Sequence, residues 1–156
     1  MKNTPANERT LYAKQLIQSL NYMTLATADN DGQPWNTPVF CAYDGEKTFY
    51  WGSRLNTQHS QNIALNEHGF IVIYDSTVEP NHGEAFYAQV TCEELTDLAE
   101  ISRAIELLHK RFGATYMAIN DVYGSAERRL YKATIKAAWV KKLDQDIREE
   151  VQLNIK

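Results

Sequence analysis

The feature that most constrains the fold is a series of strand-like segments joined by short turns between residues 22 and 54. Asp31-Gly32 and Asp44-Gly45 each lie between strand-like runs, which is a strong short-range signal for a β-hairpin. Hairpins join antiparallel neighbours, so this segment predicts an antiparallel sheet. Pro34 and Pro38 lack an N–H, which predicts an edge strand and, at Pro38, a local break in pairing.

The rest of the chain alternates helices with further strands. Apolar periodicity predicts helices over about 8–20, 57–68 and 97–112, and strands over 70–76, 84–95 and 128–143. Gly69 and Gly113 are the expected ends of the second and third helices. Asp97 and Glu100 have the spacing of a capping box at the start of the third.

This order of elements lacks the regular strand–helix alternation of a parallel sheet. It predicts a mainly β fold, a closed or half-closed antiparallel barrel with helices outside. In the last strand, simple alternation places five side chains on one face: Tyr131, Ala133, Ile135, Ala137 and Trp139. Without an interior linker or repeat, residues 1–156 are expected to form a single domain with the barrel at about 22–142.

Composition excludes several classes of function. The formal net charge is −4 with no basic cluster, which disfavours nucleic-acid binding. No apolar run approaches the ~18–20 residues that cross a membrane, and the start lacks the apolar centre of a signal peptide, so a cytoplasmic location is expected. Cys41 and Cys92 are predicted to be buried, reduced thiols. The four histidines lack metal-ligand spacing, so no metal site is expected.

No catalytic motif is present in the sequence. There is no nucleophile elbow, no phosphate-binding glycine loop and no pair of carboxylates placed for acid–base work. The catalytic residues are therefore left unknown, and any enzymatic chemistry is expected to come from a cofactor.

The corner "YWGSRLNTQHSQNI" is the best candidate for binding an anion. Asn56 or Thr57 is a natural N-cap, and the first N–H groups of the following helix carry its positive dipole end. Gln58 and His59 would add side-chain donors, and Arg54 a positive charge. The alternative is that Thr57 caps these N–H groups itself while His59 and Arg54 face water.

In this region the sequence resembles the pyridoxamine 5′-phosphate oxidase-like proteins, the FMN-binding split barrels. The resemblance rests on an "MTLAT" strand, an Asp-Gly turn, a "P…PVF" strand, an aromatic strand and a helix start of the type Ser/Thr-x-(Lys/Arg/His)-x-x-Asn-(Ile/Leu). It covers residues 10–92 well and continues more weakly to Trp139. It implies a six-stranded antiparallel Greek-key split barrel that forms a homodimer with FMN at the interface.

The resemblance also implies roles for individual residues. The strand residues Asn36, Thr37, Pro38 and Val39 would lie beside the flavin ring. Gly52 and Ser53 would contact the flavin or its ribityl chain, Thr57, Gln58 and His59 the phosphate, with Arg54 as a supporting cation, and Trp139 the flavin of the other subunit. Trp35 and Trp51 could also flank the ring, with the barrel core as the alternative for Trp51.

Two departures argue against vitamin B6 oxidation. Gln58-His59 stands where relatives with that activity carry an Arg-Lys pair, and Thr37 stands where they carry an arginine. We therefore expect an FMN-dependent oxidoreductase acting on a small-molecule substrate or electron donor. The alternatives are a non-catalytic module for FMN, haem or another planar ligand, and an F420-dependent reductase.

Overall fold

The computed structural model describes residues 6–79, 82–141 and 147–153. The helices are α1 (Ala6–Ser19), α2 (Gln58–Leu65) and α3 (Leu98–Phe112), with a short 3-10 turn η1 (Ile119–Asp121). The strands are β1 (Tyr22–Ala28), β2 (Pro34–Phe40), β3 (Ala42–Tyr43), β4 (Thr48–Arg54), β5 (His68–Tyr74), β6 (Ala85–Glu94), β7 (Arg128–Lys141) and β8 (Arg148–Glu150). The predicted barrel end at residue 142 lies outside the described residues.

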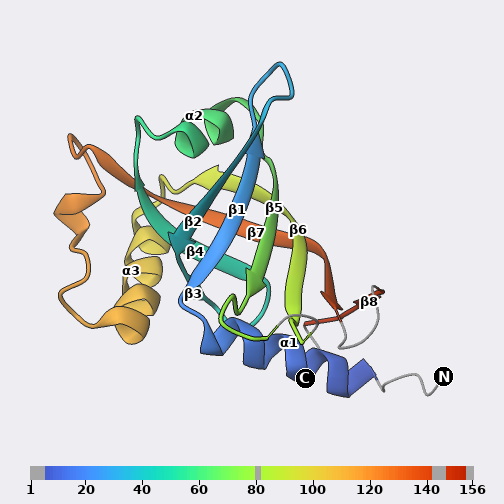
Figure 1. Cartoon of the computed structure of the whole chain (residues 1–156). Coiled ribbons are helices and arrows are strands. Elements are labelled where there is room, and N and C mark those ends of the chain that lie inside the picture. The colour runs from blue at the N-terminus through green and yellow to red at the C-terminus, as the bar shows by residue number, and fades with distance from the viewer. Residues whose placement is uncertain (1–5, 80–81, 142–146, 154–156) are drawn as a thin grey trace.

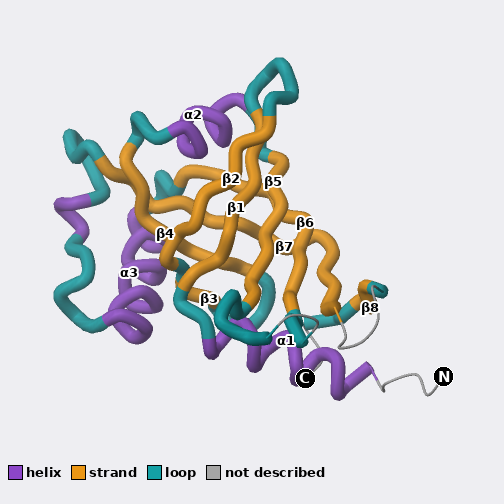
Figure 2. Tube along the Cα trace, viewed as in Figure 1, coloured by secondary structure: helices purple, strands orange, loops and turns teal. Residues whose placement is uncertain are grey.

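The strands form one antiparallel sheet in the order β2-β1-β5-β6-β7-β4-β3, with β8 paired to β7. Only Cys41 separates β2 from β3, so the chain passes from one sheet edge to the other and curls the sheet into a split barrel (Figure 2). The predicted fold class is therefore confirmed. The described residues contain eight strands rather than the expected six, because the second strand is divided at Cys41 and β8 adds a short partner.

Both predicted hairpin turns are present, and aspartate side chains fix them. Gly32 and Gly45 have φ angles of 80° and 88°, which glycine adopts without steric cost. Asp29 accepts hydrogen bonds from the N–H groups of Asp31 and Gln33. In the second turn, Asp44 accepts three backbone N–H groups in the same way. These contacts are local, which is why the turns could be read from sequence.

The barrel interior holds the main core, and the helices cover it (Figure 1). Completely buried side chains include Met23, Leu25, Phe49, Trp51, Ile71 and Phe86. Helix α1 closes the lower end of the barrel and α2 lies at the upper end, where Ile63 joins the core. Helix α3 packs on the outside of β3, β4 and β7 and forms a second core there. Both cysteines are buried and free as predicted, and burial raises the pKa of each thiol to about 12.

Two predictions about backbone breaks are wrong. Helix α2 ends at Leu65, and Gly69 instead lies inside β5 opposite Val90, because pairing with β6 extends that strand. A side chain at Gly69 would press on the Cys92 sulfur, 3.0 Å from an added Cβ. Pro38 stays in register opposite Thr24, so pairing is not interrupted there. An edge strand tolerates the missing N–H.

The prediction that five side chains of the last strand share one face is also wrong, because β7 contains a bulge. Opposite Gln89 and Val90 the register shifts, and Lys136 is left without a paired residue. A bulge reverses the alternation of side chains that follow it. Tyr131 and Ala133 point into the core as expected, but Trp139 lies on the outer face and Val140 inside.

The capping box of α3 forms only in part. Asp97 accepts the N–H of Glu100 at 2.9 Å, and Gly113 ends the helix as predicted. The Glu100 carboxylate does not return to the N-cap, because it accepts a hydrogen bond from Lys132 on β7 at 2.8 Å. The tertiary ion pair replaces the reciprocal half of the local motif.

Candidate functional site

The corner between β4 and α2 is an uncapped helix start. Thr57 occupies the N-cap with extended backbone, φ −75° and ψ 149°, and its side chain makes no capping hydrogen bond. The N–H groups of Gln58, His59 and Ser60 lie in the first turn, where a helix offers them no acceptor. The alternative in which Thr57 satisfies these groups is therefore contradicted, and the corner presents backbone donors that an anion could accept.

His59 is turned into the protein rather than toward water. It is 6% exposed, and its Nε2 lies 2.7 Å from the Ser53 hydroxyl and 3.3 Å from the Thr57 hydroxyl. Burial lowers the pKa of the imidazole below its ordinary value, so the neutral ring is favoured. Three residues predicted for the site, Ser53, Thr57 and His59, are thus brought into one hydrogen-bonded cluster.

Gln58 and Arg54 make other contacts. The Gln58 amide donates to the Asn62 side chain at 2.9 Å, and Asn62 donates in turn to Thr27 on β1 at 3.0 Å. The exposed Arg54 guanidinium lies 3.8 Å from the Glu127 carboxylate. The Ser53–Thr57–His59 cluster therefore contains neutral hydrogen-bonding groups, and Arg54, the cation predicted for this site, forms an ion pair with Glu127 at the surface.

Gly52 has a packing role beside this cluster. A Cβ at Gly52 would overlap the methyl end of Met117, which is buried in the segment between α3 and β7. The glycine thus allows Met117 to lie directly on β4. Sequence reasoning assigned Gly52 to flavin contact and did not foresee this neighbour.

The predicted residues of β2 divide between the two faces of the sheet. Asn36 pairs with Ala26 and Pro38 with Thr24, while Thr37 and Val39 pair with the fully buried Leu25 and Met23. Alternation therefore places Asn36 and Pro38 on the outer face and directs Thr37 and Val39 to the inner one. Only Asn36 and Pro38 share a face with Trp139.

The outer face also contains aromatic residues that sequence reasoning missed. Phe70 on β5 stacks on Trp139 with ring centroids 6.4 Å apart, and lies 6.5 Å from Tyr87 on β6. Near the other end of β1, Tyr22 stacks on Phe40 at 4.0 Å. The signal available in the sequence was the alternation in "FIVIY", in which Phe70 and the buried Ile71 are consecutive and so point to opposite faces of the sheet. We call the side of β2, β1, β5, β6 and β7 that carries these aromatics the outer aromatic face.

Trp51 and Trp35 have different environments. Trp51 is completely buried and stacks on Tyr131 at 5.6 Å, so it belongs to the core and cannot flank a bound ring. Its indole N–H is buried without a hydrogen-bond partner among the described residues. Trp35 is half exposed at the start of β2 and remains accessible.

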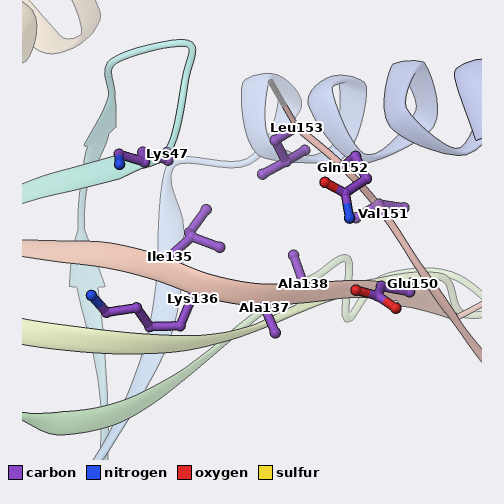
Figure 3. A pocket seen from close by; sticks show the side chains of 9 residues that line it. All are labelled: Lys47, Ile135, Lys136, Ala137, Ala138, Glu150, Val151, Gln152 and Leu153. Carbon is purple, nitrogen blue, oxygen red and sulfur yellow. The ribbon is translucent and has the colours of Figure 1, made fainter. Parts of the chain in front are cut away.

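Two cavities lie near the barrel ends. One of about 240 Å³ lies between α2 and the ends of β6 and β7, lined by Ser60, Ile63, Ala64, Glu67, Cys92, Glu93, Glu94 and Tyr131. A smaller one of about 110 Å³ lies where β7 meets the described C-terminal segment, with Lys47, Lys136 and Glu150 among its lining residues (Figure 3). Neither cavity includes the Ser53–Thr57–His59 cluster.

The described residues contain no group of three or more potential metal ligands, and none of their helices has the length and apolarity needed to span a membrane.

Comparison with known proteins adds a family match. The family model described as pyridoxamine 5′-phosphate oxidase matches residues 12–142, well over half of the chain. No curated protein sequence matches this chain significantly.

Among solved structures, the chain is similar to a haem-binding protein from Mycobacterium smegmatis, with a TM-score of 0.75 and 17% identity over 98% of this chain. The chain spans 60% of the length of that protein. It is also similar to the haem storage protein HutZ from Vibrio cholerae, with a TM-score of 0.69 and 15% identity over 85% of this chain and 94% of the other. A third similar structure is an FAD-binding protein from Mesorhizobium loti, with a TM-score of 0.63 and 18% identity over 83% of this chain and 91% of the other. At these identities the likeness shows the fold alone.

Proposed function

We propose that this chain, which belongs to the pyridoxamine 5′-phosphate oxidase family, binds FMN and uses it for electron transfer with a small molecule. The observation that carries the proposal is the uncapped start of α2 beside the Ser53–Thr57–His59 cluster. Bound FMN would supply reversible one- or two-electron chemistry, and the chain would bind, orient and shield it.

The corner fits a phosphate monoester. Three first-turn N–H groups at the positive end of the helix dipole would donate to phosphate oxygens. The Ser53 hydroxyl can add a further donor, whereas the Thr57 hydroxyl, 3.2 Å from it, donates to the Arg54 carbonyl or the Ser60 hydroxyl. The lack of a cationic pair at Gln58-His59 argues against vitamin B6 oxidation, so we leave the substrate as a small molecule.

The outer aromatic face fits a planar ring. Between its two aromatic groups lie the smaller side chains of Thr24 and Ala26 on β1, beside Pro38 and Asn36 on β2. Small side chains leave room for a ring, and the aromatics would exclude water around it. Asn36 supplies an amide that can hydrogen-bond the polar edge of such a ring.

We propose a homodimer formed through this face. Three strands, β1, β5 and β6, lie between β2 and β7 in the sheet, so Asn36 and Trp139 belong to different parts of the face. A second copy packed across the same face would bring its Trp139 close. The cofactor would then lie at the interface.

A second candidate is a non-catalytic module for haem or another planar ligand. Two of the similar structures are described as haem-binding and haem-storage proteins. In this chain His68 lies on the same side of β5 as Phe70, and it is exposed. A haem Soret band shifted by His68→Ala would favour this candidate over FMN.

FMN titration tests the first candidate. Quenching of flavin fluorescence should report binding, and Ser53→Ala should weaken FMN binding by about tenfold while changing riboflavin binding little, because one phosphate hydrogen bond is lost. Ser76→Ala, in an exposed turn, is the matched control. A protein that takes up no FMN, or equal losses for both flavins, would contradict the proposal.

A further inference from the structure

The hydrogen bonds around His59 can run in two directions. The Thr57 hydroxyl lies within reach of four acceptors or donors: Arg54 O at 3.0 Å, Ser60 Oγ at 2.8 Å, Ser53 Oγ at 3.2 Å and His59 Nε2 at 3.3 Å. A hydroxyl has one hydrogen, so Thr57 can donate in only one of these contacts at a time. A neutral imidazole can accept at Nε2 from Ser53 or donate to it, according to its tautomer.

The direction decides what the corner offers an anion. If Nε2 accepts from Ser53, the hydroxyl hydrogen is committed to the ring. If Nε2 donates to the Ser53 oxygen, the Ser53 hydrogen is released and can point to a phosphate oxygen. An imidazolium has hydrogens on both nitrogens, so protonation allows only the second arrangement.

Few charges act on this ring. Helix α2 packs against β1, β2 and β6, and neither β1 nor β2 contains a charged residue. The charged side chains on the other surrounding segments are Arg54 on β4, Glu67 after α2, Glu93 and Glu94 on β6, and Arg128 and Arg129 on β7, which pair in register with Arg54 and Ser53. Arg54 forms an ion pair with Glu127, Glu93 with Lys132, and Glu94 with Arg129. Other titratable groups described at this end of the barrel are His68 at the start of β5, which is exposed, and Cys92 and Tyr131, which are buried.

We propose that His59 couples phosphate binding at the start of α2 to the uptake of one proton from solvent, an inference that rests on the FMN site of the proposed function. In the free protein the buried ring is neutral. When the phosphate arrives, its negative charge favours the imidazolium, Nε2 donates to Ser53, and the Ser53 hydroxyl donates to the phosphate. His59 acts here as a positioning residue, since it works through the Ser53 hydroxyl.

The sign of the pH effect follows from this cycle. Burial lowers the pKa of His59 in the free protein, and a bound anion raises it. Between those two pKa values the complex holds one more proton than the free components. FMN affinity therefore rises as pH falls through this interval, by at most about tenfold per pH unit for a single proton.

The test compares the wild-type protein with His59→Gln from about pH 6.5 to about pH 8. Glutamine keeps a polar group that can contact Ser53 but does not titrate. We expect the wild-type Kd for FMN to change about three- to tenfold more across this range than that of the variant. The phosphate itself titrates with a pKa of about 6, but equally in both proteins. Riboflavin, which lacks the phosphate, should show no difference between them.

The same pH dependence in both proteins would overturn the inference and leave FMN binding intact. Failure of both proteins to bind FMN would overturn the inference together with the proposed function. Should His59→Gln not fold, calorimetry of the wild-type protein in two buffers with different ionisation heats counts the protons directly. Near pH 7.5, uptake on FMN binding that does not exceed uptake on riboflavin binding would also overturn it.

Discussion

At the scale of single residues, Gly52 shows how packing and the candidate site share one position. Its missing side chain leaves room for Met117, whose sulfur would lie 3.2 Å from an added Cβ. Met117 is itself held in place, because its carbonyl oxygen lies 2.6 Å from the His109 ring nitrogen Nε2. The loop after α3 is thereby fixed against β4, directly beside Ser53.

Gly52→Ala should destabilise the protein by about 1 kcal/mol, because the methyl group displaces only the flexible end of the Met117 side chain. Met117→Ala alone should cost about 2–5 kcal/mol as a cavity. Gly52→Ala fills the space that Met117→Ala empties. The double variant should therefore be more stable, by about 1 kcal/mol or more, than the sum of the two single effects predicts. Urea unfolding measures the cycle.

Gly83→Ala is the control for that cycle, because an added Cβ there meets only a methyl group at 3.9 Å. Its effect should stay within about 0.5 kcal/mol. Strict additivity of Gly52→Ala and Met117→Ala would show that the two side chains do not compete for space.

At the scale of elements, the end of α1 depends on a residue far away in sequence. Helix α1 has no basic residue in its last turn. Arg111 on α3 supplies the missing charge, donating to the carbonyl of Ile17 at 3.0 Å and to that of Leu20. A cation at a helix C-terminus satisfies free carbonyls and complements the dipole. This contact connects the helix that closes the barrel to the helix on its side.

Arg111→Met should lower the free energy of unfolding by about 1.5–3 kcal/mol, because charged hydrogen bonds to two carbonyls are lost while the aliphatic stem is retained. Arg103→Met, on the exposed side of the same helix, should change it by less than about 0.5 kcal/mol. Denaturant unfolding followed by circular dichroism gives both values. Equal effects of the two changes would assign the loss to helix propensity or net charge.

At the scale of the whole molecule, the described helices leave most of one side of the barrel uncovered, and Phe112 of α3 meets this side at Phe40, 5.2 Å between ring centroids. Helices α1, α2 and α3 cover the two ends and the β3–β4–β7 side (Figure 1). The outer aromatic face carries Phe70, Tyr87 and Trp139, and Arg148 of β8 lies over the Tyr87 ring at 4.2 Å. Half-buried aromatic side chains gathered on a surface favour a protein partner, here proposed to be a second copy.

If the proposed dimer forms, Phe70→Glu should convert it into a monomer of 17.9 kDa and weaken FMN binding, because the change introduces a charge at the centre of the proposed interface. Leu98→Glu places the same charge at an exposed apolar residue on α3 and should leave the dimer intact. Sedimentation velocity distinguishes the two species. A wild-type protein that is monomeric, or a Phe70→Glu variant that stays dimeric, would contradict the interface.

Much of the candidate site could be read from sequence, but not its internal contacts. The spacing of Ser53, Thr57 and His59 identified a strand end followed by a helix start, and the structure places all three together. The burial of the His59 side chain and the ion pair of Arg54 with Glu127 depend on residues distant in sequence, which the local spacing does not reveal. The burial of Trp51 is decided in the same way, by the strands that surround it.

Features that rest on neighbouring residues follow from the sequence. Asp-Gly turns made the sheet antiparallel, and the caps at Asp97 and Gly113 bounded α3, because these hydrogen bonds close within a few residues. Pairing with a distant strand overrides the local pattern at two places, and both depend on the folded chain. Gly69 joined β5, and the β7 bulge turned Trp139 to the outer face and Val140 to the core. A strand has no internal hydrogen bonds, so its ends and its faces are set by its partners.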